Sequence, residues 1–214
     1  MNWIDLILAV LMLLAVVIGS RRGLFSGIMT LIGLYVGVIL GVQYMDSATH
    51  RILSHFRGST VIIALFSFAM TFLLVYLGAK ILGGIFYKFA SLHSLGNLDK
   101  TGGAILGVFF GWIALGIALF VLVFLPLPER LENSIDRSTL GPAMRGTVAF
   151  IYEEGSSLFH PKTPSLLEKV KSALSYAPRG EMELESYSAE VKPYPEAGRQ
   201  AERIIQKMEN YFGP

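Results

Sequence analysis

Four stretches of the chain are long and apolar enough to cross the hydrocarbon core of a bilayer, a distance that takes about 20 helical residues. Asp5 is the only charged residue that lies within any of them. Each stretch therefore predicts a membrane-spanning helix, and Pro126 and Pro128 end the last one because proline cannot continue a helix. The predicted spans are Trp3–Gly19, Leu24–Met45, Val61–Ala79 and Gly102–Leu125.

The composition leads to the same conclusion. Of the 214 residues, 53% are hydrophobic and 16% are charged, and the mean hydropathy is +0.55, which is too apolar for a soluble globular chain. Residues 1–128 hold 7 Lys/Arg and 3 Asp/Glu, whereas residues 129–214 hold 11 and 13. We predict an all-α polytopic membrane protein, with a four-helix transmembrane domain over residues 1–128 and a helical, partly disordered C-terminal tail.

The tail divides into three predicted segments. Residues 129–177 form juxtamembrane amphipathic helices, with short helices over Ala143–Tyr152 and Ser165–Ala177. Residues 178–199 contain five glutamates and three prolines, which is typical of an exposed linker. Residues 200–214 form an amphipathic helix, which lies on the protein's own juxtamembrane surface, on the bilayer interface or in a groove of a partner protein. Its apolar stripe is Ala201, Ile204, Ile205, Met208 and Phe212.

The basic residues between the spans predict the topology. The start of the chain has no basic residue ahead of its apolar segment, so we expect an uncleaved span and not a signal peptide. The connection Ser20–Gly23 is short and predicts a tight helical hairpin with two arginines at its tip. Five basic residues on this side against two on the other predict that both termini lie outside the cytoplasm. The five are Arg21, Arg22, Lys80, Lys88 and Lys100, and the two are Arg51 and Arg57.

Glycines recur at four-residue spacing in three places. This spacing puts them on one helix face, where the missing side chains let another backbone approach closely. Such faces serve helix packing, or alternatively line a pore or a substrate path. Because three faces exceed what one closed four-helix bundle requires, we also predict a homo-oligomer. The series are Gly19, Gly23, Gly27; Gly33, Gly37, Gly41; and Gly103, Gly107, Gly111.

Two charged residues near the spans have both a structural and a functional interpretation. A carboxylate in hydrocarbon is a candidate proton relay, but Asp5 lies at the start of its helix, where the headgroup region and the positive end of the helix dipole favour it. Lys80 lies at the predicted end of the third span, from which its long side chain reaches the interface. We therefore expect both residues to be interfacial.

The sequence Asp99-Lys100-Thr101-Gly102 resembles the phosphorylation sequence of P-type cation pumps. That chemistry also needs a magnesium site and a soluble nucleotide-binding domain, and neither fits between the third and fourth spans. The favoured interpretation is that Asp99 caps the fourth helix, with its carboxylate accepting hydrogen bonds from that helix's first N–H groups.

Motifs for other chemistry are missing from the sequence. It has no cysteine, its four histidines have no zinc-ligand spacing, and it has no P-loop or GxSxG motif. It also has no basic stripe with interleaved aromatic residues. We therefore predict no enzyme activity, no metal or other cofactor, and no nucleic-acid binding.

Several features together resemble the colicin V production protein family. They are Asp5 in an apolar first helix, the Gly19-Ser20-Arg21-Arg22-Gly23 turn, the glycine-spaced second helix, and Leu98-Asp99-Lys100 before Gly103 and Gly107. The resemblance covers about residues 1–145. It implies a bacterial inner-membrane protein associated with the production or export of a peptide bacteriocin, and it marks Asp5, Arg22, Gly23, Asp99, Gly103 and Gly107 as candidate functional positions.

Two functions agree with these features. The first is a non-enzymatic, oligomeric membrane scaffold that supports toxin production or envelope function, in contact with the lipid bilayer and with a protein partner for its C-terminal helix. The alternative is a small channel or transporter with glycine-lined helices and Asp5 as an ion site.

Overall fold

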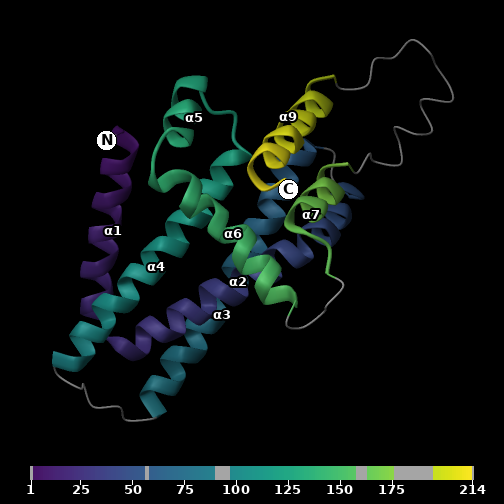
Figure 1. The fold of residues 1–214 in the computed structure, drawn as a ribbon. Coiled ribbons are helices and arrows are strands. Elements are labelled where there is room, and N and C mark those ends of the chain that lie inside the picture. Colours follow the sequence, from purple (N-terminus) through teal and green to yellow (C-terminus); the bar gives the residue numbers. More distant parts are fainter. Residues whose placement is uncertain (1, 56–57, 90–96, 158–162, 176–194, 214) are drawn as a thin grey trace, which may run out of the picture.

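The computed structural model describes residues 2–55, 58–89, 97–157, 163–175 and 195–213. Within these ranges every regular element is a helix, which confirms the all-α prediction (Figure 1). Those in the first 123 residues are α1 (Trp3–Arg22), α2 (Leu24–Leu53), α3 (Thr60–Phe89) and α4 (Asn97–Val123). They are followed by α5 (Glu129–Asp136), α6 (Leu140–Ser157), α7 (Leu166–Leu174) and α9 (Pro195–Phe212).

The first four helices are the predicted membrane spans. Each is long and apolar enough to cross a bilayer, and α4 ends before Pro126 as expected. Three of the helices extend well beyond the apolar stretches, because backbone hydrogen bonding continues where the hydropathy falls. In particular, α3 runs on to Phe89. Lys80 is therefore an exposed residue within this helix, whereas the prediction placed it at the helix end.

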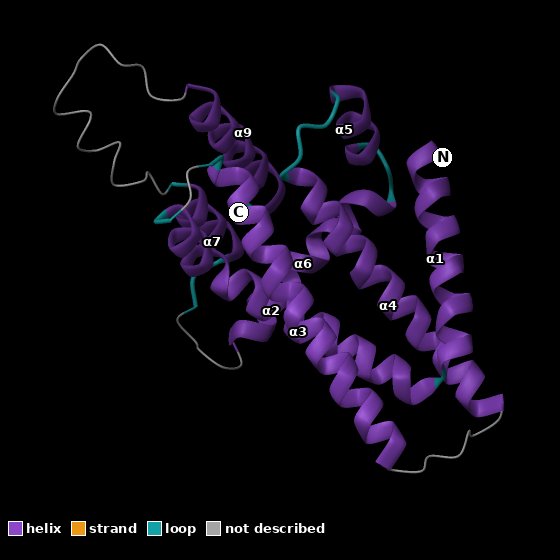
Figure 2. Ribbon diagram, turned by 180° about the vertical axis from the view of Figure 1, so that it is seen from behind, coloured by secondary structure: helices purple, strands orange, loops and turns teal. Residues whose placement is uncertain are grey.

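The spans form two pairs. Helix α1 lies along α4, and α2 lies along α3 and also contacts α4 (Figures 1 and 2). A single residue, Gly23, separates α1 from α2, and its φ of +80° is one that L side chains rarely adopt. The predicted tight turn is thus present. The two helices then diverge, because α1 packs closely on α4 whereas α2 packs mainly on α3.

The helices after the spans gather at the end of the molecule where α1 begins (Figure 1). Helix α6 packs on α4 and α2, α7 packs mainly on α2, and α9 contacts α7, α3, α6 and α4. Helix α7 starts with the capping box of Ser165 and Glu168, in which the Glu168 amide donates to the Ser165 hydroxyl at 3.2 Å. Helix α5 lies within the segment predicted to be amphipathic, although its own bounds were not predicted.

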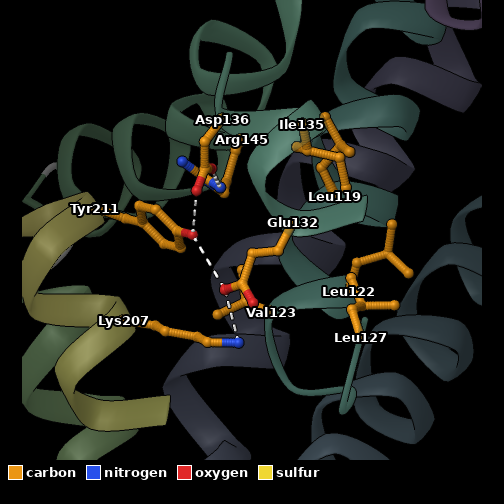
Figure 3. Close-up of a pocket in the computed structure, with 10 residues that line it drawn as sticks. All are labelled: Leu119, Leu122, Val123, Leu127, Glu132, Ile135, Asp136, Arg145, Lys207 and Tyr211. Carbon is orange, nitrogen blue, oxygen red and sulfur yellow. Dashed lines mark hydrogen bonds and ion pairs between the residues drawn. The ribbon is translucent and has the colours of Figure 1, made fainter. Parts of the chain in front are cut away.

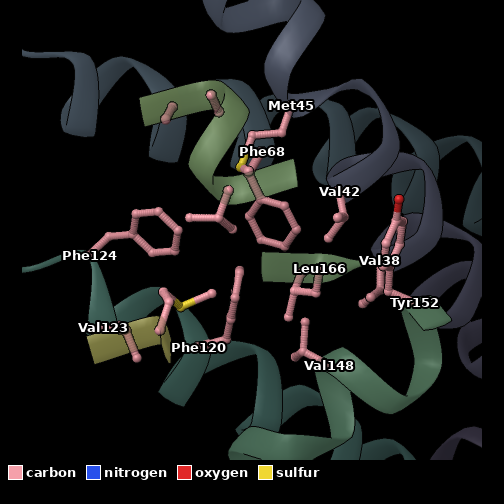
Figure 4. Close-up of a cluster of buried hydrophobic side chains, with 14 of the residues drawn as sticks. Val38, Val42, Met45, Phe68, Phe120, Val123, Phe124, Val148, Tyr152 and Leu166 are labelled. Carbon is pink, nitrogen blue, oxygen red and sulfur yellow. The ribbon is translucent and has the colours of Figure 1, made fainter. Parts of the chain in front are cut away.

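One apolar core joins the spans to the later helices (Figure 4). The rings of Phe68 in α3 and Phe120 in α4 lie 5.4 Å apart in an edge-to-face arrangement, and both are fully buried. Val148 of α6 and Leu166 of α7 are fully buried in the same cluster. The segments on either side of residue 128 therefore share a single interior.

Helix α9 lies on the chain's own surface, which was one of the predicted targets. Its apolar stripe packs into the core, with Met208 fully buried and Phe212 6.4 Å from Phe120, ring centre to ring centre. It begins at Pro195, earlier than the predicted Gln200. Residues 178–194 of the predicted acidic linker lie outside the described residues.

The outer faces of α1 and α3 remain apolar and exposed. Leu13 in α1 and Ile62 in α3 are each 66% exposed, and Leu74 in α3 is 64% exposed. Exposed apolar side chains in this number are expected where lipid covers a helix, because the bilayer core favours them.

Candidate functional site

The α1–α4 contact is made by backbone against backbone. A side-chain carbon built at Gly107 would lie 2.7 Å from the carbonyl oxygen of Ala15, and one at Gly19 would lie 2.6 Å from the Cα of Gly107. Gly103 lies against the Gly19 carbonyl oxygen and Gly111 against the side chain of Ala15. The pairing order shows that the helices are antiparallel, and glycine is what permits their approach.

The remaining glycines of the three series also face helices of the same chain. Gly27 lies against the Leu106 side chain of α4, and a side-chain carbon there would be 2.8 Å from it. Gly33, Gly37 and Gly41 face the aromatic side chains of α3, together with Ala79. The first series is not one helix face as predicted, because the Gly23 turn separates Gly19 in α1 from Gly27 in α2. Contacts within one chain account for the glycines of all three series. The surplus of faces that led to the homo-oligomer prediction is therefore absent, and that prediction has to be tested separately.

Asp5 connects the first span to the first turn of α6. Its Oδ1 accepts hydrogen bonds from the backbone N–H groups of Thr139 at 2.9 Å and Leu140 at 3.1 Å, and its Oδ2 accepts from the Asn2 N–H at 3.3 Å. The residue is only 7% exposed. A carboxylate here satisfies amides that have no partner within α6 and is favoured by the dipole of that helix. The sequence could not indicate this partner, which is more than 130 positions away in the chain.

Asp99 makes the equivalent contact at the other end of the helix pair. Its Oδ1 accepts a hydrogen bond from the Leu24 N–H, the first residue of α2, at 2.8 Å. The carboxylate lies directly against Gly23, where a side chain would collide with it. Asp99 was expected to cap its own helix, but it caps α2 instead. The reason is that the Gly23 turn brings the start of α2 to this carboxylate.

These two aspartates have similar roles at the two ends of the helix pair. Asp5 belongs to α1 and caps α6, whereas Asp99 belongs to α4 and caps α2. They lie at opposite ends of the antiparallel α1–α4 pair, each in the first turn of its own helix. Together they fix where the two helices that leave this pair begin.

Arg22 and Lys100 lie near Asp99 at the end of the pair. Both side chains are exposed, and the Arg22 guanidinium carbon is 6.0 Å from the centre of the Phe110 ring. Arg22 immediately precedes the Gly23 turn, and Lys100 immediately follows Asp99. The candidate positions Arg22, Gly23, Asp99, Gly103 and Gly107 therefore lie together, whereas Asp5 lies at the far end of α1.

A second group of charged residues was not predicted. Five residues from α5, α6 and α9, which we call the charge cluster, form the polar part of the lining of a pocket whose other lining residues are apolar (Figure 3). The empty volume of the pocket is about 280 Å³, including space open to the surroundings. Arg145 donates to Asp136 at 2.9 Å, and its guanidinium carbon lies 3.3 Å from the centre of the Tyr211 ring. Lys207 pairs with Glu132 at 2.7 Å. The charge cluster consists of Glu132, Asp136, Arg145, Lys207 and Tyr211.

The charge cluster holds α9 against α5 and α6. The Tyr211 hydroxyl donates its one proton to Asp136 at 2.9 Å, and a Glu132 carboxylate oxygen lies 3.4 Å from the same hydroxyl. Burial, followed by the hydrogen bond to Asp136, raises the pKa of Tyr211 to about 12, although the charge of Arg145 opposes the rise. The hydroxyl is therefore protonated near neutral pH and acts as a donor. The one sequence signal for this cluster was Arg145, which lies on the same face of α6 as the core residue Val148.

Another tyrosine and another ion pair hold α6 and α7 to α2. The Tyr152 hydroxyl donates to the Gln43 side chain at 3.0 Å, and burial, followed by the nearby Asp46 carboxylate, raises the pKa of Tyr152 to about 12. Lys169 of α7 pairs with Asp46 at 3.1 Å, and both side chains are largely buried. In the part of the chain that the structure describes, no group of three His, Asp or Glu residues is placed to hold a metal ion.

The helix pair lies within a region that matches a known protein family. The family model described as colicin V production protein matches residues 4–149. This chain belongs to the colicin V production protein family. The match takes in the α1–α4 contact, both aspartate caps and Arg145, and it ends before α7 and α9. No curated protein and no solved structure matches the chain.

Membership identifies a multi-pass membrane protein of the colicin V production family. Its four spans carry the family region, and Lys207 and Tyr211, which complete the charge cluster, come from beyond that region. Helices α7 and α9 lie beyond the matched region and pack against it through the shared core.

Proposed function

We propose that this protein is a non-enzymatic scaffold of the bacterial inner membrane that supports the production or export of a peptide toxin and the integrity of the envelope. The observation that carries the proposal is that Asp5 caps α6 and Asp99 caps α2. Each carboxylate accepts backbone N–H groups from a helix far away in the chain, so the acids of the helix pair have a positioning role. A scaffold needs such fixed geometry between its membrane part and the helices it presents outside.

The glycine contacts support the same proposal. A path lined by backbone would leave open space beside the glycines, whereas those of the three series face backbone or side chains of neighbouring helices at contact distance. Packing is the role that this arrangement favours over a channel lining.

The variant Asp5→Asn separates the scaffold from the channel or transporter. An asparagine oxygen can still accept hydrogen bonds from Thr139 and Leu140, but the side chain no longer carries a proton or an ion. In a strain that lacks its own copy and makes colicin V, we expect Asp5→Asn to restore secretion close to the wild-type level. We expect Gly107→Leu, which pushes α1 from α4, to fail.

Solute flux across proteoliposome membranes tests the channel or transporter directly. Purified protein in proteoliposomes should give no more solute flux than empty vesicles. Flux that is present in the wild type and lost in Asp5→Asn would overturn the scaffold proposal in favour of the channel or transporter. Secretion and envelope-stress phenotypes that are unaffected by Gly107→Leu would also contradict a scaffold, because its packing is what that variant disrupts.

A further inference from the structure

One end of the α1–α4 pair carries an excess of exposed positive charge. Arg21 and Arg22 end α1, and Lys100 follows Asp99 in the first turn of α4. All three basic side chains are exposed. The hydrogen bond from the Leu24 N–H to Asp99 ties the two chain segments together, so the three charges belong to one surface, which we call the cationic end.

The helix register brings two of these charges onto the contact between the helices. Arg22 follows Gly19 by three residues and therefore shares its face, which packs on α4. Lys100 precedes Gly103 by three residues and shares the face that packs on α1. Arg22 and Lys100 therefore belong to the same end of the α1–α4 contact.

The ion pairs of the structure lie elsewhere. Across the described ranges, neither arginine of the cationic end nor Lys100 forms an ion pair, and the single nearby acid, Asp99, has one oxygen engaged by Leu24. Arg145 of α6, Lys169 and Lys171 of α7 and Lys207 of α9 form ion pairs toward the opposite end of the molecule.

Apolar side chains adjoin the cationic end. The Arg22 guanidinium points back along the pair toward the Phe110 ring, 6.0 Å away. Val108 of α4, eight residues after Lys100 and so on the same side of the helix, is 41% exposed within the span. A ligand that suits this surface has an anionic head and a long apolar body. Arginine can bind a phosphate with two parallel hydrogen bonds, and lysine adds a point charge.

We propose that the cationic end binds the phosphate-bearing headgroup of an anionic phospholipid, with Arg22 and Lys100 as its main contacts and Arg21 as a supporting charge. The acyl chains then lie along the exposed apolar side chains of α4. This binding is independent of the scaffold function, and it orients the α1–α2 turn toward the leaflet that is richer in anionic lipid.

The test uses the full chain purified in a mild detergent. Phosphatidylglycerol or phosphatidylcholine is titrated in, and the apparent affinity is taken from the rise in melting temperature. We expect phosphatidylglycerol to stabilise the wild type more than phosphatidylcholine does. Arg22→Gln should weaken phosphatidylglycerol binding roughly fivefold, which corresponds to about 1 kcal/mol for one charge, and Lys100→Gln should weaken it similarly. Arg22→Lys should retain most of the affinity.

Arg137→Gln is the matched control. It removes another exposed arginine, next to α5 and away from the cationic end, and should leave lipid binding unchanged. Inorganic phosphate at the same concentration should give no shift, and an equal shift would overturn the lipid assignment. Equal stabilisation by the two lipids would overturn the proposal, and so would full binding by both glutamine variants. If Arg22→Gln does not fold, Lys100→Gln and Arg21→Gln carry the same test.

Discussion

At the scale of single residues, small and acidic side chains decide where helices begin and how closely they approach. Gly19 and Gly107 let two backbones touch, and Gly23 has the positive φ that turns the chain between α1 and α2. Asp5 and Asp99 then satisfy the amides at the starts of α6 and α2. None of these residues contributes much apolar area, so their effect on stability comes from geometry and hydrogen bonding.

The glycine contact predicts a sharp difference between two Gly→Ala variants. At Gly107 the added methyl group meets the α1 backbone, so we expect a loss of about 1–3 kcal/mol in the free energy of unfolding. At Gly78 in α3 nothing lies within 4 Å, so alanine should leave stability unchanged or raise it by up to about 1 kcal/mol through helix propensity. Unfolding in mixed micelles measures both values. Equal effects at the two positions would contradict the packing.

The cap made by Asp5 predicts that two substitutions of this residue differ in their effect on stability. Asp5→Ala leaves the Thr139 and Leu140 amides without a partner, and we expect it to lower the free energy of unfolding by about 0.5–2 kcal/mol. Asp5→Asn keeps an acceptor and should cost less. The comparison is made by the same unfolding assay. If alanine and asparagine cost the same, the cap does not act through these hydrogen bonds.

At the scale of elements, α9 is held by an apolar stripe on one side and by polar contacts beside it. Met208 is fully buried among residues of the spans and of α7, which gives the helix its affinity for this surface. Arg145, 7% exposed, is stacked on Tyr211 and paired with Asp136, which sets the position of the helix end. The stripe was visible in the sequence, but the polar partners come from three helices and were not.

The raised pKa values of Tyr211 and Tyr152 predict a loss of stability at high pH. The usual tyrosine pKa is 10, and in the folded protein each is about 12. Between these values the folded state keeps a proton that the unfolded state releases. The stabilisation is fully present below pH 10 and is lost as the pH rises toward 12.

A pH series of thermal unfolding tests this behaviour. Tyr211→Phe keeps a ring over Arg145 but removes the titrating hydroxyl, so it should make the fall in stability between pH 10 and 12 shallower. Tyr152→Phe should do the same, and the double variant should do so to a greater extent. A slope identical to that of the wild type in the double variant would contradict the raised pKa values.

At the scale of the whole molecule, the four spans and the later helices form one structure with a shared core. The start of α1 and the C-terminal helix lie at the same end, as an even number of spans requires (Figure 2). The ion pairs lie in the helices gathered toward this end, whereas the opposite end of the α1–α4 pair is cationic. The positive-inside rule predicts that this cationic end faces the cytoplasm.

Fusion reporters test this orientation. With both termini outside the cytoplasm, an alkaline phosphatase joined to the C-terminus is expected to be active, and a GFP at the same place is expected to stay dark. The same fusions placed at the α1–α2 turn serve as the inverse control. A fluorescent C-terminal GFP together with an inactive phosphatase would reverse the predicted topology.

The oligomeric state needs its own measurement. The glycine faces are all used within one chain, so a homo-oligomer must form through the exposed apolar faces of the spans or through other surfaces. Crosslinking in native membranes is expected to yield a species larger than the monomer if the prediction holds. Only monomer at saturating crosslinker would contradict it.

The sequence by itself determined the four spans, the ending of the fourth before Pro126, the amphipathic stripe of α9 and the family. These features depend on local hydropathy and on short spacings, which a chain carries wherever it folds. Tertiary structure alone decided that α1 pairs with α4, that Asp99 caps α2, and that Arg145 meets Tyr211. Each of these contacts joins residues far apart in sequence, and its geometry follows from how the backbones approach, which no local pattern records.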